Sequence, residues 1–300
     1  MSKKVCFIIN PVSGTGSWKG IEENIEKYLD PSFSRVVFFT EYAGHAIELA
    51  NDASKTCDVV VAVGGDGMMN EVARGIIGTK AALAIVPAGS GNALARHLEI
   101  PLTHKGAIEC INKMNTRVID TATMNDEDFF AVCGTGYDAE VANKFAESSK
   151  RGFLTYVTLA MKNYFSYKPA TYDIIIDGNA MQKKAFLISI ANGSQYGNNA
   201  HIAPKASTRD GMLDVCILKP FPLIVAPILA LRLFGWSLDN SPYMDVVRGR
   251  SIHIRNADRH TPLCVHYDGE PAGTTDEIRV EVAPRTLTVV APEKKQKTHL

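Results

Sequence analysis

The sequence lacks several features that would place it in a large functional class. Lys plus Arg and Asp plus Glu number 32 each, so the formal net charge is zero. A neutral balance argues against bulk binding to nucleic acid, and no nucleic-acid partner is expected. The six cysteines are scattered and form no C-x-x-C pattern. They predict neither a zinc site nor a disulfide framework, and they favour a reducing compartment.

No targeting or membrane-spanning segment is evident either. The N-terminus, MSKKVCFIIN, enters an apolar run directly, and we expect a cytoplasmic protein without a signal peptide. The segment that comes nearest to a membrane span, Phe221–Trp236, is shorter than the roughly 20 residues needed. Pro222 and Pro227 interrupt it, and Arg232 lies inside it. It is either a helix of a second domain or an amphipathic surface that touches a bilayer, with Trp236 at the interface.

Two familiar nucleotide-binding motifs are also missing. The loop Asn10–Gly16 follows an apolar run and is rich in small residues, but no G-K-[ST] comes after it, as a Walker A loop requires. Lys19 stands where the third glycine of a G-x-G-x-x-G fingerprint would be, which argues against a plain dehydrogenase. The loop alone is therefore a weak indication of phosphate binding.

The most informative stretch that is present runs from Cys57 to Ile77, CDVVVAVGGDGMMNEVARGII. A β-branched run predicts a strand buried on both faces, and apolar residues at helical spacing predict a helix after it. The glycines of Gly64–Gly67 between them allow positive φ and a close ligand, and the helix N-terminus favours a phosphate. Asp66 in this loop suits a divalent metal or a proton to be removed, or it is a helix-capping residue in a tight turn.

Strands and helices alternate through the first part of the chain. We expect strands at Val5–Ile9, Arg35–Phe39, Val59–Val63 and Ala82–Val86. This order predicts a Rossmann-like parallel sheet with right-handed crossovers. Ligands bind at the carboxyl ends of such strands, so the glycine-rich loops Asn10–Gly16, Gly64–Gly67 and Gly89–Gly91 should meet at one edge. A nucleotide with backbone amides around its phosphates is the simplest common ligand.

From about Arg117 the pattern changes to short strands separated by tight turns, which predicts antiparallel β structure. We therefore expect an α/β nucleotide-binding domain over residues 1–125 and a β-sandwich-like domain over residues 126–286. The tail, residues 287–300, is a candidate addition to the first domain.

Two acidic turns lie in the predicted second domain. In IAPKASTRDGMLDV, Asp210 precedes Gly211, and Asp214 follows four residues on. Oxygen-rich turns of this kind suit Mg²⁺ or Ca²⁺, although a simple hairpin turn explains the Asp-Gly pair equally well. In VHYDGE, a turn accounts for Asp268 but not for the second carboxylate, Glu270.

Taken in order, these motifs resemble a known family. NPVSGTG, GGDG with MMNEVARG, PAGSGNALARHL, PKASTRDGMLDV and the late DGE are similar to the diacylglycerol-kinase catalytic superfamily, over nearly the whole chain. That superfamily includes bacterial diacylglycerol and other lipid kinases and the sphingosine kinases. The resemblance implies an NAD kinase- or diacylglycerol kinase-like α/β domain followed by a β-sandwich domain, with the active site in the cleft between them.

The implied function is an ATP-dependent lipid kinase that phosphorylates the hydroxyl of a lipid alcohol, such as diacylglycerol or a sphingoid base. It implies a role in lipid metabolism such as phospholipid biosynthesis, a peripheral contact with the membrane that holds the lipid, and a possible homodimer. The alternatives are an NAD kinase-like enzyme and a non-catalytic sensor that binds a nucleotide or a lipid. Met68, where many bacterial members have Thr, and Ser90 with Ala93, as in sphingosine kinases, leave the lipid open.

The resemblance also implies roles for individual residues. ATP would be held by Asn10, Pro11, Ser13, Gly14, Gly16, Thr40, Gly64, Gly65, Asp66, Gly67, Asn70, Gly89, Ser90 and Asn92. Mg²⁺ would be bound by Asp210 with the backbone carbonyls of Ser207 and Met212. The catalytic base would be Glu270, or Asp268 beside it, as in bacterial lipid kinases, or Asp66, which matches the sphingosine kinase aspartate.

Overall fold

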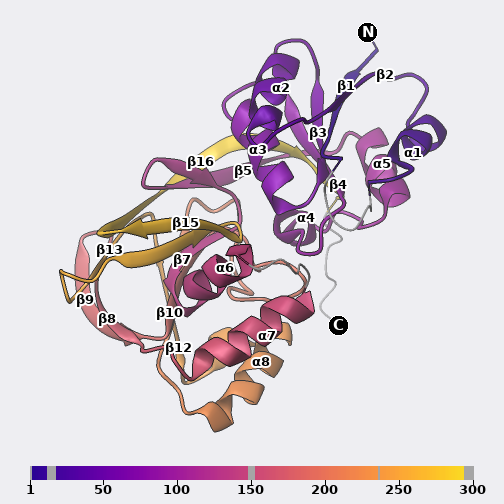
Figure 1. Cartoon of the computed structure of the whole chain (residues 1–300). Helices are drawn as coiled ribbons and strands as arrows, with labels where there is room; N and C mark the ends of the chain where they lie inside the picture. Colours follow the sequence, from indigo (N-terminus) through magenta and orange to yellow (C-terminus); the bar gives the residue numbers. More distant parts are fainter. Residues whose placement is uncertain (1, 12–17, 148–152, 236, 294–300) are drawn as a thin grey trace, which may run out of the picture. The chain divides into compact units, whose positions relative to one another are not determined.

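The computed structural model describes residues 2–11, 18–147, 153–235 and 237–293. The chain divides into two compact units (Figure 1). Unit 1 comprises Met1–Ile119 and Thr286–Leu300, and unit 2 comprises Asp120–Arg285. Two strands, β5 (Thr116–Met124) and β16 (Glu277–Val290), belong to unit 1 at one end and to unit 2 at the other.

Unit 1 contains a parallel sheet in the order β2-β1-β3-β4. Its strands are β1 (Lys4–Ile9), β2 (Ser34–Phe39), β3 (Val59–Gly64) and β4 (Ala82–Pro87). The end of β16 extends the sheet beyond β4, where Val289 pairs in parallel with Leu83. β1, β3 and β4 are almost wholly buried, as expected for β-branched strands covered on both faces. The prediction of a parallel α/β domain is confirmed.

Helices cover both faces of this sheet. α1 (Ile21–Tyr28) and α5 (His104–Asn112) lie on one side, and α2 (His45–Ser54) and α3 (Asp66–Ile76) lie on the other (Figure 1). α2 and α3 approach closely because α3 carries Gly75, where an added Cβ would lie 2.6 Å from the carbonyl oxygen of Ile47. This contact holds the end of α3 against α2.

Unit 2 is an antiparallel β-sandwich. One sheet has the order β12-β11-β10-β7-β14-β15, and the other contains β16, β13, β8 and β9. The strands of the first sheet are β7 (Val132–Gly136), β10 (Leu187–Ala191), β11 (Leu213–Leu218), β12 (Met244–Gly249), β14 (Leu263–Tyr267) and β15 (Glu270–Thr275). The strands of the second are β8 (Ala170–Ile176), β9 (Asn179–Ala185), β13 (Ser251–Asn256) and the first part of β16, with β6 (Glu127–Phe129) pairing β5.

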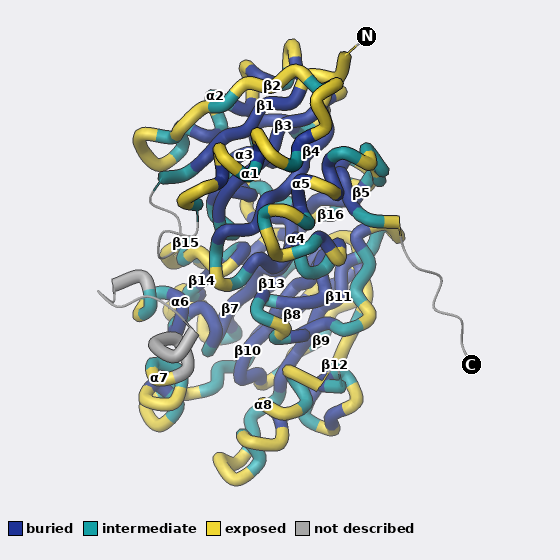
Figure 2. Tube along the Cα trace, turned by 90° about the vertical axis from the view of Figure 1, so that its right-hand side faces the viewer, coloured by how far each residue is buried: buried dark blue, intermediate teal, exposed yellow. Residues whose placement is uncertain are grey.

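Alternate residues of the two sheets form a single core, in which Ile174, Ile254 and Val280 meet Ile188, Val215 and Val265. Figure 2 shows these strands as buried and several of the helices as largely exposed. The short strands and tight turns predicted after residue 117 are thus arranged by packing sheet on sheet. The predicted β-sandwich is confirmed.

The helices of unit 2 are α6 (Tyr137–Glu147), α7 (Phe153–Tyr164) and α8 (Ala226–Phe234), with the 3₁₀ turns η1 (Leu223–Val225) and η2 (Leu238–Asn240). η1 and α8 account for most of the apolar segment 221–236. Pro227 is in the first turn of α8, where a proline removes no helical hydrogen bond. Among the described helices, none is both long enough and apolar enough to cross a bilayer.

Candidate functional site

The loops that follow successive strands of unit 1 meet at the carboxyl edge of its sheet. The N–H of Asn10 donates to the carbonyl of Val63 (3.2 Å), and the N–H of Thr40 donates to that of Ile9 (2.9 Å). The parallel pairing therefore continues past the strand ends, which places Asn10 beside the loop after β3 and Thr40 beside the loop after β1. Pro11 follows Asn10, while Ser13, Gly14 and Gly16 lie outside the described residues.

The loops after β3 and β4 touch through two glycines. A Cβ built on Gly89 would lie 2.5 Å from the Cα of Gly65, and one on Gly65 would lie 3.4 Å from the Cα of Gly89. Nearby, the N–H of Ala88 donates to the carbonyl of Gly64 (2.8 Å). Close approach of two backbones therefore explains glycine at position 89, because any side chain there would overlap the neighbouring loop.

The expectation of positive φ at these glycines is wrong. None of the described glycines with positive φ belongs to either loop. The left-handed residue is instead Asn92, with φ 53° and ψ 48°, at the N-cap of α4 (Ala93–His97). Its side chain makes the local turn, since Nδ2 donates to the carbonyl of Gly89 (2.6 Å) and Oδ1 accepts the N–H of Gly89 (3.2 Å). Asparagine tolerates this conformation because its amide can hydrogen-bond the adjacent backbone.

Asp66 fastens these two loops together. Its Oδ2 accepts the N–H of Asn92 (2.8 Å), and its Oδ1 accepts the N–H of Ala93 (2.6 Å). Asp66 is also the first residue of α3, a helix whose N-cap, Gly65, supplies no side-chain hydrogen bond. The Asp66 carboxylate therefore caps the start of α4, although Asp66 itself belongs to α3. The first turn of α3 lies at the same edge and has no capping side chain of its own.

Further along α3, Asn70 is buried, whereas Ser90, in the loop before α4, is exposed. Asn10, Thr40, Gly64, Gly65, Asp66, Gly67, Gly89, Ser90 and Asn92 therefore all belong to loops or helix starts at one edge of the unit 1 sheet. The arrangement offers backbone N–H groups and a helix N-terminus, which are the groups that bind phosphate.

In unit 2, the two carboxylates of the DGE sequence have different environments. Asp268 and Gly269 both have positive φ and form the tight turn between β14 and β15. The carboxylate of Asp268 is buried and accepts three backbone N–H groups, from Phe130 (2.9 Å), Ala131 (2.7 Å) and Val132 (3.2 Å). Asp268 therefore ties the hairpin to the start of β7.

Glu270 is the carboxylate of this pair that is available to a ligand. It begins β15, is exposed, and makes no hydrogen bond or ion pair with any described residue. Its backbone position is fixed by pairing of Tyr267 with Glu270 across the hairpin. A rigid strand thus presents an accessible carboxylate, as a general base requires.

A buried polar cluster beside this hairpin was not predicted from the sequence. Oδ2 of Asp138, at the start of α6, accepts the hydroxyls of Ser189 (3.1 Å) and Tyr196 (2.8 Å). Nε2 of His266, on β14, lies 3.0 Å from the same oxygen. Nδ1 of His266 is buried without a partner among the described residues. Asp138 and His266 lie within the motif segments GTGYDAEVA and VHYDGE, but spacing gives no sign that the two meet.

The loop predicted to hold Mg²⁺ is closed by an arginine. Oδ2 of Asp210 accepts Nη2 of Arg248, and Oδ1 of Asp210 accepts the N–H of Met212 (3.2 Å). Nε of Arg248 also donates to Asp214 (3.1 Å), a carboxyl whose pKa burial raises although Arg248 acts in the opposite direction. The charge of Asp210 and Asp214 is thus already countered.

This geometry does not fit a resident divalent cation. A metal held by Asp210 and the carbonyls of Ser207 and Met212 would have to displace the Arg248 guanidinium. The Mg²⁺ ligand set stays a prediction that the geometry does not support.

Comparison with known proteins identifies the family. The model of the diacylglycerol kinase catalytic domain matches residues 4–124, and that of the YegS C-terminal NAD kinase beta sandwich-like domain matches residues 131–291. The second match alone spans more than half of the chain. The chain belongs to the family that joins a diacylglycerol kinase catalytic domain to a YegS C-terminal NAD kinase beta sandwich-like domain. The family resemblance predicted from the sequence is therefore confirmed.

Similar members of this family are found in several bacteria. A protein named diacylglycerol kinase in Bacillus subtilis (strain 168) is 27% identical over 301 residues, covering 98% of each chain. One named probable lipid kinase YegS-like in Chromohalobacter salexigens is 26% identical over 281 residues, covering 91% of this chain and 89% of that one. A crystal structure described as a diacylglycerol kinase from Bacillus anthracis str. Sterne covers 97% of each chain with a TM-score of 0.74 at 21% identity, which shows a shared fold.

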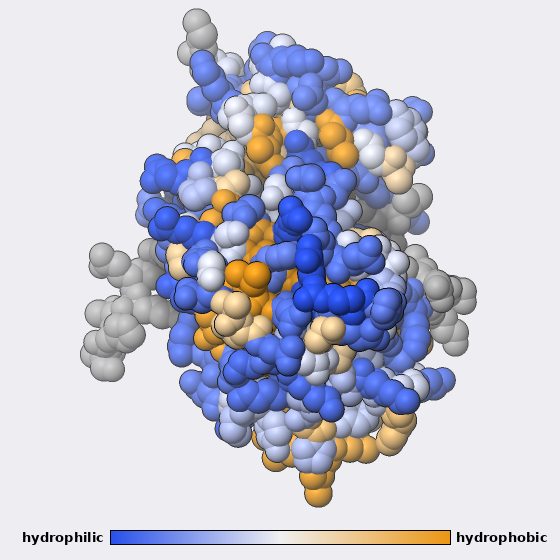
Figure 3. Space-filling view, turned by 90° about the vertical axis from the view of Figure 1, so that its left-hand side faces the viewer, coloured by the Kyte–Doolittle hydropathy of each residue, from blue (hydrophilic) through white to orange (hydrophobic). Residues whose placement is uncertain are grey.

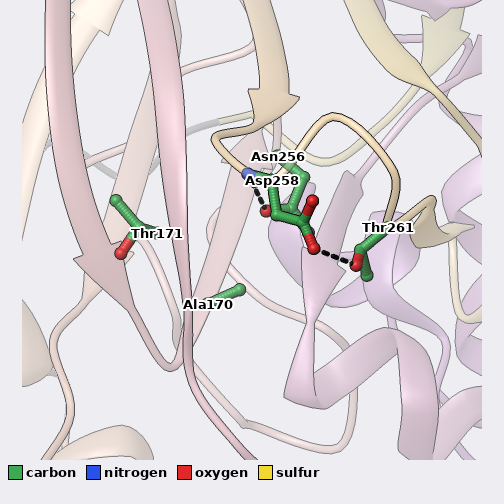
Figure 4. Close-up of a pocket in the computed structure, with 5 residues that line it drawn as sticks. All are labelled: Ala170, Thr171, Asn256, Asp258 and Thr261. Carbon is green, nitrogen blue, oxygen red and sulfur yellow. Dashed lines mark hydrogen bonds between the residues drawn. The ribbon is translucent and has the colours of Figure 1, made fainter.

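A pocket elsewhere in unit 2 of this kinase-family chain contains none of the predicted site residues. It is lined by Ala170, Thr171, Asn256, Asp258 and Thr261 (Figure 4). Oδ1 of Asn256 accepts the N–H of Asp258 (3.1 Å), and Oδ2 of Asp258 accepts the hydroxyl of Thr261 (2.6 Å). The Thr261 hydroxyl and the His260 N–H lower the pKa of Asp258. These hydrogen bonds stabilise the turn after β13, so the polar groups of the pocket are accounted for by the local structure.

Proposed function

We propose that this protein is an ATP-dependent lipid kinase, which transfers the γ-phosphoryl group of ATP to the hydroxyl of a lipid alcohol such as diacylglycerol or a sphingoid base. Membership of the diacylglycerol kinase family supports the reaction class. The observation that carries the proposal is the contact of Gly65 with Gly89 at the carboxyl edge of the unit 1 sheet. It holds two loops with their backbone amides near one helix start, as a triphosphate site requires.

In this proposal, unit 1 binds ATP through Asn10, Thr40, the Gly64–Gly67 loop, Asn70 and the loop from Gly89 to Asn92. Pro11, Ser13, Gly14 and Gly16 complete the set that the resemblance implies. Few cationic side chains stand in these loops, and Nε of Arg96 donates to the carbonyl of Gly91 (2.9 Å). Backbone amides and the Mg²⁺ that accompanies ATP as its complex would therefore offset most of the phosphate charge.

For the chemical step we assign the base to Glu270. The lipid oxygen forms a bond to the γ-phosphorus while the bond from that phosphorus to the β–γ bridging oxygen breaks, and ADP leaves. The hydroxyl proton passes to the carboxylate of Glu270. Asp66 and Asp268 are the other candidates, but their oxygens already accept backbone N–H groups, so we give them positioning roles.

The deciding experiment is incubation with γ-labelled ATP, Mg²⁺ and a panel of diacylglycerol, sphingosine and other lipid alcohols. We expect label in at least one lipid, and the panel identifies which. Absence of labelled lipid throughout the panel would contradict the proposal. NADP formation from NAD would favour the NAD kinase-like alternative, and ATP binding without any turnover would favour a sensor.

The same proposal places the protein in the cytoplasm, in peripheral contact with the membrane that contains its substrate. It extends to a role in phospholipid metabolism if diacylglycerol is the labelled lipid. A homodimer stays a prediction that size-exclusion chromatography with light scattering would check.

A further inference from the structure

The outer side of unit 2 carries a cluster of exposed apolar side chains, which we call the apolar cap. It comprises Leu223, Ile224, Ile228, Leu231 and Phe234 on η1 and α8, and Met161 and Phe165 at the end of α7. Figure 3 shows hydrophobic residues at the lower end of the molecule, the end at which α8 lies in Figure 1. Exposed apolar patches of this kind mark interaction sites.

α8 presents its apolar side chains outward in an ordered way. Ile224, Ile228 and Leu231 follow helical spacing, and they are 83%, 55% and 74% exposed. Leu229 is buried on the inner side, and the N–H of His201 donates to the carbonyl of Leu233 (2.9 Å), which attaches the helix to the unit. A surface helix of a free-standing globular unit would expose polar residues at the outer positions.

The end of α7 is joined to this helix by an aromatic cluster. The hydroxyl of Tyr164 donates to the carbonyl of Phe221 (2.8 Å), and the Tyr164 and Phe221 rings lie 5.7 Å apart. Phe186 packs against Phe221 at 4.8 Å. The exposed side chains Met161 and Phe165 are therefore fixed beside the start of the η1–α8 segment, which makes the apolar cap one surface on a rigid base.

The segments that carry the cap contain basic residues and no acidic ones. Neither 153–172 nor 215–237 contains Asp or Glu, whereas Lys162 and Lys168 are exposed beside the α7 part. Of the nearest described acidic residues along the chain, Asp173 pairs with Arg259 (2.6 Å), Asp214 with Arg248 (3.1 Å) and Asp239 with Lys205 (2.7 Å). Glu140 of α6 accepts the amide of Asn163 (3.3 Å), the residue after Lys162. An apolar surface bordered by exposed lysines that form no ion pair with a described residue complements an anionic lipid bilayer.

We propose that the apolar cap is a bilayer-docking surface. The apolar side chains of α8 enter the boundary between headgroups and acyl chains, and Lys162 and Lys168 face anionic headgroups. α8 has nine residues, about 14 Å of helix, so it lies in the interface and does not span. This inference deepens the proposed function, since a lipid kinase meets its substrate in a bilayer, but vesicle binding is measured without any catalysis.

The test is flotation of the full chain with vesicles of phosphatidylcholine, with and without 30 mol% phosphatidylglycerol. We expect binding to the anionic vesicles that weakens as salt rises. The double variant Ile224→Glu/Leu231→Glu should weaken binding roughly tenfold or more, because two carboxylates would enter the interface. Lys162→Gln/Lys168→Gln should reduce the preference for anionic vesicles and leave apolar adsorption.

A matched control is Val36→Glu/Phe38→Glu, which places two glutamates at exposed apolar positions of β2 in unit 1 and should leave vesicle binding unchanged. Equal binding by the wild type and the Ile224→Glu/Leu231→Glu variant would overturn the proposal. So would a wild-type dimer that the same variant converts to monomer while vesicle binding persists, because the cap would then be a contact between copies of the chain.

A second readout separates this inference from the proposed kinase activity. The Ile224→Glu/Leu231→Glu variant should phosphorylate a short-chain, water-dispersed lipid alcohol at the wild-type rate and lose rate only on vesicles. A wild type that binds anionic vesicles but labels no lipid would overturn the kinase proposal and leave the docking surface supported. Equal loss on both substrate forms would contradict a docking role.

Discussion

The side chains of Asp66, Asp268 and Glu270 differ in how many backbone N–H groups they already accept. Asp66 accepts two and Asp268 accepts three, whereas Glu270 has no hydrogen bond to any described residue. Backbone N–H groups that donate to a carboxylate stabilise its anionic form, so that carboxylate is poorly suited to take a proton. The free carboxylate is therefore the one expected to act in proton transfer.

Glu270→Gln should lower kcat for lipid phosphorylation by roughly 10²–10⁴-fold, because glutamine cannot accept the hydroxyl proton. ATP binding, measured by equilibrium titration, should stay unchanged. Asp268→Asn is the informative comparison, since its NH2 group would replace a carboxylate oxygen that accepts at least one of three backbone N–H groups. It should lower the free energy of unfolding by about 1–3 kcal/mol. Activity of the Glu270→Gln variant within twofold of wild type would exclude Glu270 as the base.

The contact of the two glycine loops makes a prediction with its own control. Gly89→Ala should lower the free energy of unfolding by about 1–3 kcal/mol, because its Cβ would meet the Gly65 backbone at 2.5 Å. Gly65→Ala meets Gly89 at an ordinary 3.4 Å and should cost clearly less. Urea unfolding of both variants measures the difference. Equal stability of the two would show that the loops do not touch as described.

At the scale of elements, side chains on the paired strands β13 and β16 make a pH-dependent contribution to the stability of the fold. Glu277 accepts Nε of Arg255 (2.6 Å) and lies 2.9 Å from Nε2 of His253. These hydrogen bonds, that of Arg255 first and that of His253 second, lower the pKa of Glu277 to about 2. A folded-state pKa below the ordinary value of 4.5 means that the contribution is complete above about pH 4.5. It is lost as the pH falls toward 2.

Glu277→Gln should therefore reduce the urea midpoint at pH 7 and have little effect at pH 2.5, where wild-type Glu277 loses most of its advantage. Both variants are compared at each pH and at low ionic strength, because exposed ion pairs are screened by salt. Glu281→Gln, which alters a carboxylate of the same strand that accepts the Ser251 hydroxyl (2.5 Å), is the control for a general charge effect. An identical loss at both pH values would contradict the assignment.

For the whole molecule, the fold follows from patterns that the sequence displays. The buried β-branched runs, as in Val59–Val63, alternate with helical segments in the first part of the chain, whereas short strands and tight turns follow residue 117. These two patterns separate the parallel sheet from the sandwich. The hydrogen-bond partners of individual side chains are harder to predict from the sequence. The link from Asp66 to Asn92 crosses 26 residues, and Asp138 meets His266 across 128 residues. The spacing of motifs along the chain predicts neither of these contacts. A role inferred from an acidic residue in a turn therefore leaves out the hydrogen bonds that the residue makes in the fold.

The predicted metal site is a further case in which the sequence does not show the partner of an acidic residue, here Arg248. It also leads to a test on the stability of the whole molecule. An Asp-Gly turn with a second aspartate matches a cation site in sequence, but the cation in the structure is the guanidinium of a residue 34 positions after Asp214. Mg²⁺ alone should therefore leave the thermal unfolding of the wild type unchanged. Mg²⁺ with ATP at about 100 times Kd should stabilise the protein by about 2.7 kcal/mol.

Hydrogen exchange locates the effect. Protection by Mg·ATP should fall on the loops after β1, β3 and β4 in unit 1, and the segment from Ser207 to Asp214 should keep its exchange rates. In Arg248→Gln the paired carboxylates lose their cation, so Mg²⁺ alone should now raise the melting temperature. Stabilisation of the wild type by Mg²⁺ alone, with slower exchange from Ser207 to Asp214, would instead establish a resident cation at Asp210. Arg248 would then be its competitor, because a guanidinium and a metal cannot share the same carboxylate oxygens.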